Sequence, residues 1–123
     1  MTTDSIKELM QKITAFRDAR NWKQFHNPKD LAICISLEAA ELLEIFQWSG
    51  AEIEADTEEK RERIREELAD VLMYCCLMAD NMDFDIAEIM LDKMEQNNKK
   101  YPVEKSYGKS DKYTAYLDEE TEE

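Results

Sequence analysis

The sequence predicts an all-α fold, a four-helix bundle-like domain. Apolar residues recur at helical spacing along most of its 123 residues, while only two Gly and two Pro are available for the tight turns that β-hairpins need. Hydrophobic residues make up 43% of the chain, which excludes a disordered acidic protein and is enough for one small core. We therefore expect one domain over residues 1–114, followed by a disordered acidic tail over residues 115–123.

The first helix is predicted over residues 5–20. Asp4 or Ser5 can cap its free backbone amides, and apolar side chains then follow at helical spacing as far as Phe16. The segment 21–26 breaks this spacing, because it carries two large aromatic residues and the only histidine of the chain. We interpret this segment as the end of the helix and a connecting loop.

The second helix is predicted over residues 28–48. Asn27 is expected to cap it and Pro28 to take its first position, since proline lacks a backbone N–H that the first turn would leave unpaired. Apolar residues continue at helical spacing to the end of this range, where Ser49-Gly50 should stop the helix. The acidic stretch 52–59 is then expected to be a solvated connection.

Two further helices are predicted over residues 57–81 and 85–100. The third begins with charges of both signs and then becomes nearly continuous in apolar residues, which indicates an exposed start and a buried second half. The fourth carries an apolar stripe until Tyr101-Pro102, where the proline disfavours helical backbone at the preceding residue. Five acids among the last six residues, 118–123, suggest disorder at the end of the tail.

The charge balance narrows the range of partners. With 29 acidic and 16 basic residues the net charge is −13, so nucleic acid and anionic membranes are poor partners. Charged residues interrupt the N-terminal region, so we expect no signal peptide, and no apolar run is long enough to span a membrane. Cys34, Cys75 and Cys76 lie within helical patterns without zinc spacing, which indicates reduced thiols in a cytoplasmic protein.

Two pairs of carboxylates stand out within the predicted helices. Glu38 and Glu41 lie three residues apart in the second helix, and Glu67 and Asp70 repeat this spacing in the third. Residues at this spacing share one helix face, and both pairs are flanked by apolar residues. Four carboxylates in one apolar crevice repel one another and lose hydration, and a divalent cation would relieve both costs.

The ligand types favour a hard cation. Oxygen ligands suit Mg²⁺ or Mn²⁺, whereas zinc prefers His and Cys. A di-iron bundle is excluded, because it needs Glu-x-x-His motifs and His26 is the only histidine. The spacing does not decide between Glu66 and Glu67 as the glutamate ligand from the third helix. Glu44 could be an auxiliary ligand. The alternative is that all these residues are ordinary acids on exposed helix faces.

Aromatic and basic residues supply what a nucleotide would need. Trp22, Phe25, Trp48 and Tyr74 lie near helix ends or on the acidic faces and could stack on a base, although they could equally be core or interface residues. Residues 93–112 carry six lysines against three acids, so this segment has a net charge of +3 in an acidic chain. Such a patch could bind a polyphosphate, or it could simply complement the helix dipole.

Taken together, these residues resemble the all-α nucleotide pyrophosphohydrolases of the MazG-like superfamily, and most of all the dCTP pyrophosphatase branch. The resemblance extends from about residue 6 to residue 114. It is carried by Phe25-His26-Asn27-Pro28, Ser36 to Leu42, Phe46-Gln47-Trp48, Glu66 to Leu72, Lys93-Met94 with Asn97, Lys100-Tyr101-Pro102-Val103 and Lys112-Tyr113-Thr114.

The resemblance implies a magnesium site of the ExxE…ExxD type at Glu38, Glu41, Glu67 and Asp70. It further implies hydrolysis of a nucleoside triphosphate between the α- and β-phosphates, giving the monophosphate and pyrophosphate. The implied substrate is dCTP or a modified pyrimidine deoxynucleotide, and the implied role is cleansing of the nucleotide pool. Mg²⁺ would activate a water, and Glu38 or Glu41 would accept its proton.

The resemblance also implies the substrate contacts and the assembly. Some relatives carry a histidine near the base where this chain has Ile13, which leaves the base preference open. Relatives pair their helices between subunits, so a homodimer or a dimer of dimers is expected. The alternative function is a helical module that binds nucleotides or proteins without hydrolysis. The implied contacts are Trp22, Trp48 and Tyr74 for base and sugar, Lys93, Asn97 and Tyr101 for phosphates, and Lys100 and His26 as further candidates.

Overall fold

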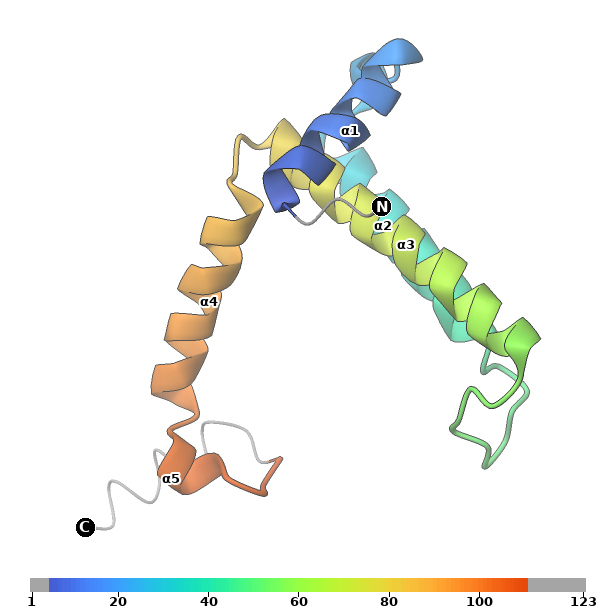
Figure 1. The fold of residues 1–123 in the computed structure, drawn as a ribbon, viewed down its shortest axis with the longest axis vertical. Helices are drawn as coiled ribbons and strands as arrows, with labels where there is room; N and C mark the ends of the chain where they lie inside the picture. Colours follow the sequence, from blue (N-terminus) through green and yellow to red (C-terminus); the bar gives the residue numbers. More distant parts are fainter. Residues whose placement is uncertain (1–4, 111–123) are drawn as a thin grey trace. The chain divides into compact units, whose positions relative to one another are not determined.

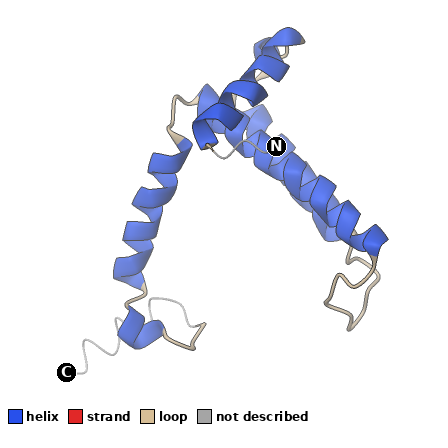
Figure 2. Cartoon of the chain, in the orientation of Figure 1, coloured by secondary structure: helices blue, strands red, loops and turns tan. Residues whose placement is uncertain are grey.

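The computed structural model describes residues 5–110, and these residues form helices joined by loops, with no strand among them (Figures 1 and 2). The predicted all-α class is confirmed. The acidic tail and Lys112 lie outside the described residues. The elements are α1 (Ile6–Ala19), a 3₁₀ turn (Lys23–Phe25), α2 (Pro28–Glu44), α3 (Glu58–Asn81), α4 (Ile86–Lys100) and α5 (Val103–Ser106).

Three helices begin where the sequence predicts, because a side chain caps each of them. Ser5, Asn27 and Thr57 each accept a hydrogen bond from the backbone N–H three residues later, at 3.4, 2.9 and 3.2 Å. These bonds satisfy amides that have no partner within the first helical turn. Pro28 occupies the first turn of α2, as expected.

The end of α2 and the presence of α5 differ from the prediction. α2 ends at Glu44, four residues before the predicted end, because the chain tightens into turns of the i→i−3 type, with the Phe46 N–H 3.0 Å from the Leu43 carbonyl oxygen. Ile45 is buried in this turn, and Gly50 then takes a left-handed backbone with φ of 60°. The short helix α5 was not predicted, since the sequence after Pro102 lacks a clear period.

The chain divides into two compact units, one ending at Asp85 and the other beginning at Ile86. In the first unit, α2 and α3 run antiparallel and side by side, and α1 also packs on α3 (Figure 1). Ile13, Leu31 and Leu77, one from each helix, form the core of this unit. The second unit contains α4 and α5. The bundle-like packing of all four long helices stays a prediction.

Two other expectations concern the whole described chain. Its three cysteines are free thiols, in agreement with the expected absence of disulfides. Among the helices of residues 5–110, none is long and apolar enough to cross a membrane.

Candidate active site

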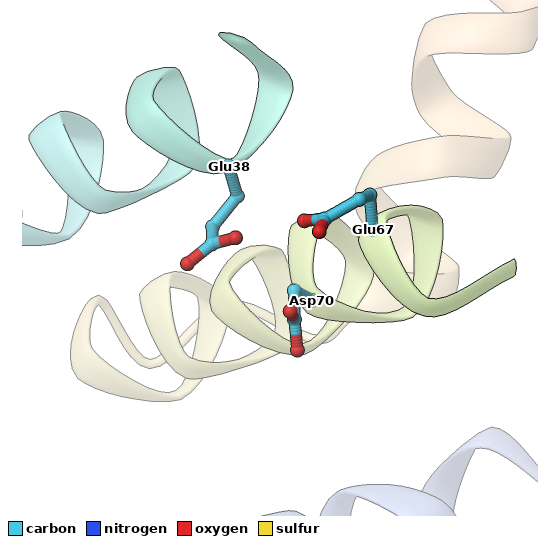
Figure 3. A group of neighbouring side chains, drawn as sticks. All are labelled: Glu38, Glu67 and Asp70. Atoms are coloured by element: carbon cyan, nitrogen blue, oxygen red, sulfur yellow. The ribbon is translucent and has the colours of Figure 1, made fainter. Parts of the chain in front are cut away.

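Three carboxylates from two helices meet in the first unit. Glu38 on α2 faces Glu67 and Asp70 on α3 (Figure 3), and one oxygen of each lies within 4.8 Å of the others. The spacing of three residues puts Glu67 and Asp70 on one face of α3, and antiparallel packing places Glu38 opposite them. Glu67, rather than Glu66, belongs to this carboxylate cluster. The spacing of three residues predicted that these carboxylates share helix faces, and the resemblance pointed to Glu67 rather than Glu66; their role as metal ligands stays a prediction.

Glu41 stands outside the cluster of three but is bonded to it. Its carboxyl shares hydrogen bonds with Glu38 and with Glu67. Burial, the bond to Glu41 and the charges of Glu41, Asp70 and Glu67 together raise the pKa of Glu38 from 4.5 to about 7. The pKa of Glu67 is also raised, chiefly by its bond to Glu41. A hydrogen bond between two carboxyl groups needs a proton, so this arrangement retains protons that isolated carboxylates would release.

The residues of the cluster fit a divalent cation. One oxygen each of Glu38 and Glu67 is buried and has no hydrogen-bond partner within the described part of the chain. Buried oxygens without partners are costly, and a cation would pair with them while removing the mutual repulsion. A ligand set made only of carboxylate oxygens suits a hard cation, and binding would displace the retained protons.

A pocket of about 220 Å³ lies beside the cluster, and Asp70 belongs to both. Trp22, His26 and Tyr74, three of the predicted substrate-binding residues, are brought together here. Trp22 packs edge-on against Phe16 with ring centroids 5.8 Å apart, which fixes one aromatic wall. The remaining walls are formed by Ile13, Phe16, Arg17, Met73 and Leu77. The pocket is therefore aromatic and apolar, with a carboxylate at one side.

Two polar residues of the pocket, His26 and Tyr74, are held in their neutral forms. Burial and the nearby Arg17 guanidinium lower the pKa of His26, so this imidazole is neutral at pH 7. Burial, together with contacts to Cys34 and the charges of Glu38 and Asp70, raises the pKa of Tyr74. A neutral imidazole and a neutral phenol each offer one donor and one acceptor, which suits an uncharged polar group such as a nucleoside.

Arg17 is a pocket residue that the sequence reasoning missed. Its side chain is buried, with the Nε and Nη1 atoms 2.9 Å from Asp18 and 2.6 Å from Asp80. A signal was present in the sequence, since Arg17 follows Ile13 by one helical turn and so continues the apolar face of α1. Nothing local identified its partner Asp80, which lies 63 residues away.

The other predicted contacts are not assembled in this pocket. Trp48 follows α2, is 89% exposed and does not line it. Lys93, Asn97 and Lys100 lie on α4 and Tyr101 directly follows it, all in the second unit. Their role in phosphate binding stays a prediction.

Fold and site together define a class: helical proteins in which a carboxylate cluster able to hold a cation adjoins an aromatic pocket. The chain belongs to the MazG-like family, whose model matches residues 33–115. It is 38% identical over 116 residues to dCTP pyrophosphatase 1 of Rattus norvegicus and 36% identical to that of Homo sapiens. Each alignment covers 92% of this chain but 66% of the relative, so the chain spans about two thirds of their length.

A solved structure agrees with this assignment. The crystal structure of a pyrophosphatase from Archaeoglobus fulgidus superimposes with a TM-score of 0.71 at 39% identity. The match covers 83% of this chain and 96% of the archaeal one. The resemblance inferred from the sequence is therefore confirmed at the level of the family.

Proposed function

We propose that this protein is a Mg²⁺-dependent nucleoside triphosphate pyrophosphohydrolase that releases a monophosphate and pyrophosphate. The observation that supports this most is the shared position of Asp70, which joins the carboxylate cluster to the aromatic pocket. A cation site next to a base-sized pocket is what a metal-bound nucleotide requires. The names of the relatives, dCTP pyrophosphatase and pyrophosphatase, point to the same reaction.

Glu38, Glu67 and Asp70 would hold the cation, with Glu41 as the fourth predicted ligand beside them and Mn²⁺ as a possible substitute for Mg²⁺. When bound, Mg²⁺ would neutralise phosphate oxygens and make a water molecule more acidic. Glu38 or Glu41 would accept the proton of the attacking water. Glu41 suits this role by position, because it is bonded to Glu38 and Glu67 without belonging to the group of three.

The pocket would take the nucleoside, with Trp22 and Tyr74 against its rings and His26 as a polar contact. We propose dCTP or a modified pyrimidine deoxynucleotide as the substrate, in a cytoplasmic role that cleanses the nucleotide pool. Ile13 forms part of the pocket wall, so an apolar side chain would lie beside the base. Lys93, Asn97, Lys100 and Tyr101 of the second unit would bind the phosphates.

A homodimer or a dimer of dimers would complete the site. Trp48 is exposed and does not line the pocket of its own chain, and in such an assembly it would contact the nucleotide of another subunit. Large apolar side chains such as Leu37 and Leu43 are also exposed on α2 and would be covered by a second copy. Light scattering at micromolar concentration tests this part of the proposal, and a monomer would contradict it.

The decisive experiment measures products. Purified protein and Mg²⁺ are mixed with each common and modified deoxynucleoside triphosphate, and monophosphate, pyrophosphate and phosphate are quantified. Glu38→Gln and Asp70→Asn should abolish turnover, whereas Glu59→Gln, which removes an exposed acid in the first turn of α3 outside the cluster, should retain it. Release of single phosphate would contradict cleavage between the α- and β-phosphates. Absence of any product with every nucleotide would favour a binding module.

A further inference from the structure

Arg17 is buried and connects two helices through an ion pair with the partly exposed Asp80. Only 4% of this residue is exposed, although it carries a positive charge. Its Nη1 donates to Asp80 Oδ2 at 2.6 Å, which links α1 to the last turn of α3, and its Nε donates to Asp18 Oδ1 at 2.9 Å. A guanidinium held by two carboxylates has a fixed orientation.

The same residue lies at the junction of the two pocket walls. Phe16 and Trp22 form the wall on the side of α1, and the Arg17 carbonyl oxygen accepts the Trp22 N–H at 3.2 Å. Tyr74 and Leu77 form the facing wall on α3. Arg17 thus contacts the α1 wall through its backbone and the α3 helix through its side chain.

A second bond repeats this connection one residue later. Asn81 follows Asp80 on α3, and its Nδ2 donates to the backbone oxygen of His26 at 3.3 Å. His26 also lines the pocket. Two consecutive residues at the end of α3 therefore hold both α1 and the segment that follows it.

Hydrophobic packing alone could have joined these helices. Burying the Arg17 guanidinium removes its hydration, and its pairing with the partly exposed Asp80 offsets that cost without a large gain over apolar packing. What the pair adds is direction and a fixed distance. At this position the distance that it fixes is the separation of the two walls around the pocket.

We propose that Arg17 is a positioning residue for the nucleoside, acting through its ion pair with Asp80 to set the separation of the α1 and α3 walls. This inference rests on the proposed function, since it assumes that the pocket receives the nucleoside. It assigns Arg17 no contact with the reacting phosphates.

Calorimetric titration with α,β-methylene dCTP and Mg²⁺ tests this without requiring turnover. Arg17→Met keeps most of the side-chain volume and should weaken binding about tenfold, because the ligand would then have to order two walls that the ion pair otherwise holds in place before binding. Asp80→Asn should weaken it in the same direction, and Arg17→Lys should restore part of the affinity. Lys7→Met removes an exposed cation from the same helix and should bind like the wild type. Where dCTP is hydrolysed, KM should rise while kcat and Mg²⁺ affinity stay unchanged.

Four results would overturn the inference. One is Arg17→Met binding within twofold of the wild type. Another is weak binding by Arg17→Met with wild-type binding by Asp80→Asn, because Arg17 would then contact the nucleotide directly. If Arg17→Met fails to fold, wild-type affinity in both Arg17→Lys and Asp80→Asn would be equally decisive. The last is a wild-type chain that binds no analogue. A wild type that binds the analogue but never releases pyrophosphate would refute the proposed hydrolysis only. The binding affinities of the Arg17 and Asp80 variants would still test the proposed role of Arg17.

Discussion

Glu38→Gln is expected to have opposite effects on the metal-free and the metal-bound protein. The folded state raises the pKa of Glu38 from 4.5 to about 7, so it binds a proton more tightly than the unfolded chain does. Stability from this group is therefore present below pH 4.5 and lost as pH rises through about 7. At pH 8 without a cation, the charged carboxylate destabilises the fold, and the glutamine amide removes that charge.

The size of the effect follows from the same shift. A shift from 4.5 to about 7 sets an upper limit of roughly 3 kcal/mol, and partial solvation of the cluster reduces the expected gain to about 1–2 kcal/mol. For a domain of this size, that gain corresponds to a Tm higher by roughly 5 °C. Mg²⁺ should stabilise the wild type and leave Glu38→Gln almost unchanged, since the variant lacks one of the ligands.

Thermal unfolding followed by circular dichroism measures both effects, at pH 8 and pH 5.5, with EDTA and with Mg²⁺. Glu59→Gln serves as the control, because it removes an exposed acid in the first turn of α3, outside the cluster. If Glu38→Gln is no more stable than the wild type at pH 8 in EDTA, or if the control gains as much, then mutual repulsion in the cluster is not what the structure indicates.

Three further predictions concern the fold. Leu31→Ala should lower the free energy of unfolding by about 2–4 kcal/mol, because the side chain is 1% exposed, whereas Ile53→Ala, at 81% exposed, should change it by less than about 0.5 kcal/mol in urea titrations. Asn27→Ala should cost about 1 kcal/mol in the same titrations, through loss of the cap on α2. Burial raises the pKa of the Cys76 thiol, so it should react with a thiol reagent at pH 8 more slowly than in the urea-unfolded chain; equal rates would contradict its burial.

Features set by neighbouring residues were predictable from the sequence. Asn27 caps α2 because the cap bonds the backbone three residues later, and Glu67 lies on the same face of α3 as Asp70 because three residues separate them, although spacing alone left Glu66 as an alternative. The end of α2 was predicted too late, since helical spacing continues beyond Glu44 while the backbone turns to bury Ile45. Helical periodicity does not report such a change in backbone hydrogen bonding.

Features set by distant residues were not predictable. The pair of Arg17 and Asp80 depends on how α1 crosses α3. The sequence around either residue does not predict its partner. Trp48 shows the complementary difficulty: its sequence context suggested a pocket residue, yet within one chain it is exposed. A side chain that would act in another subunit has no local signal to distinguish it.

The double membership of Asp70 has a thermodynamic consequence. One carboxylate helps to form the carboxylate cluster and also lines the pocket. A cation and a nucleoside that both contact Asp70 do not bind independently. The factor by which the cation changes the affinity for the nucleoside must equal the factor by which the nucleoside changes the affinity for the cation. The preference for one nucleoside over another would therefore differ with and without a cation. That difference would equal the difference between the effects of the two nucleosides on the affinity for the cation.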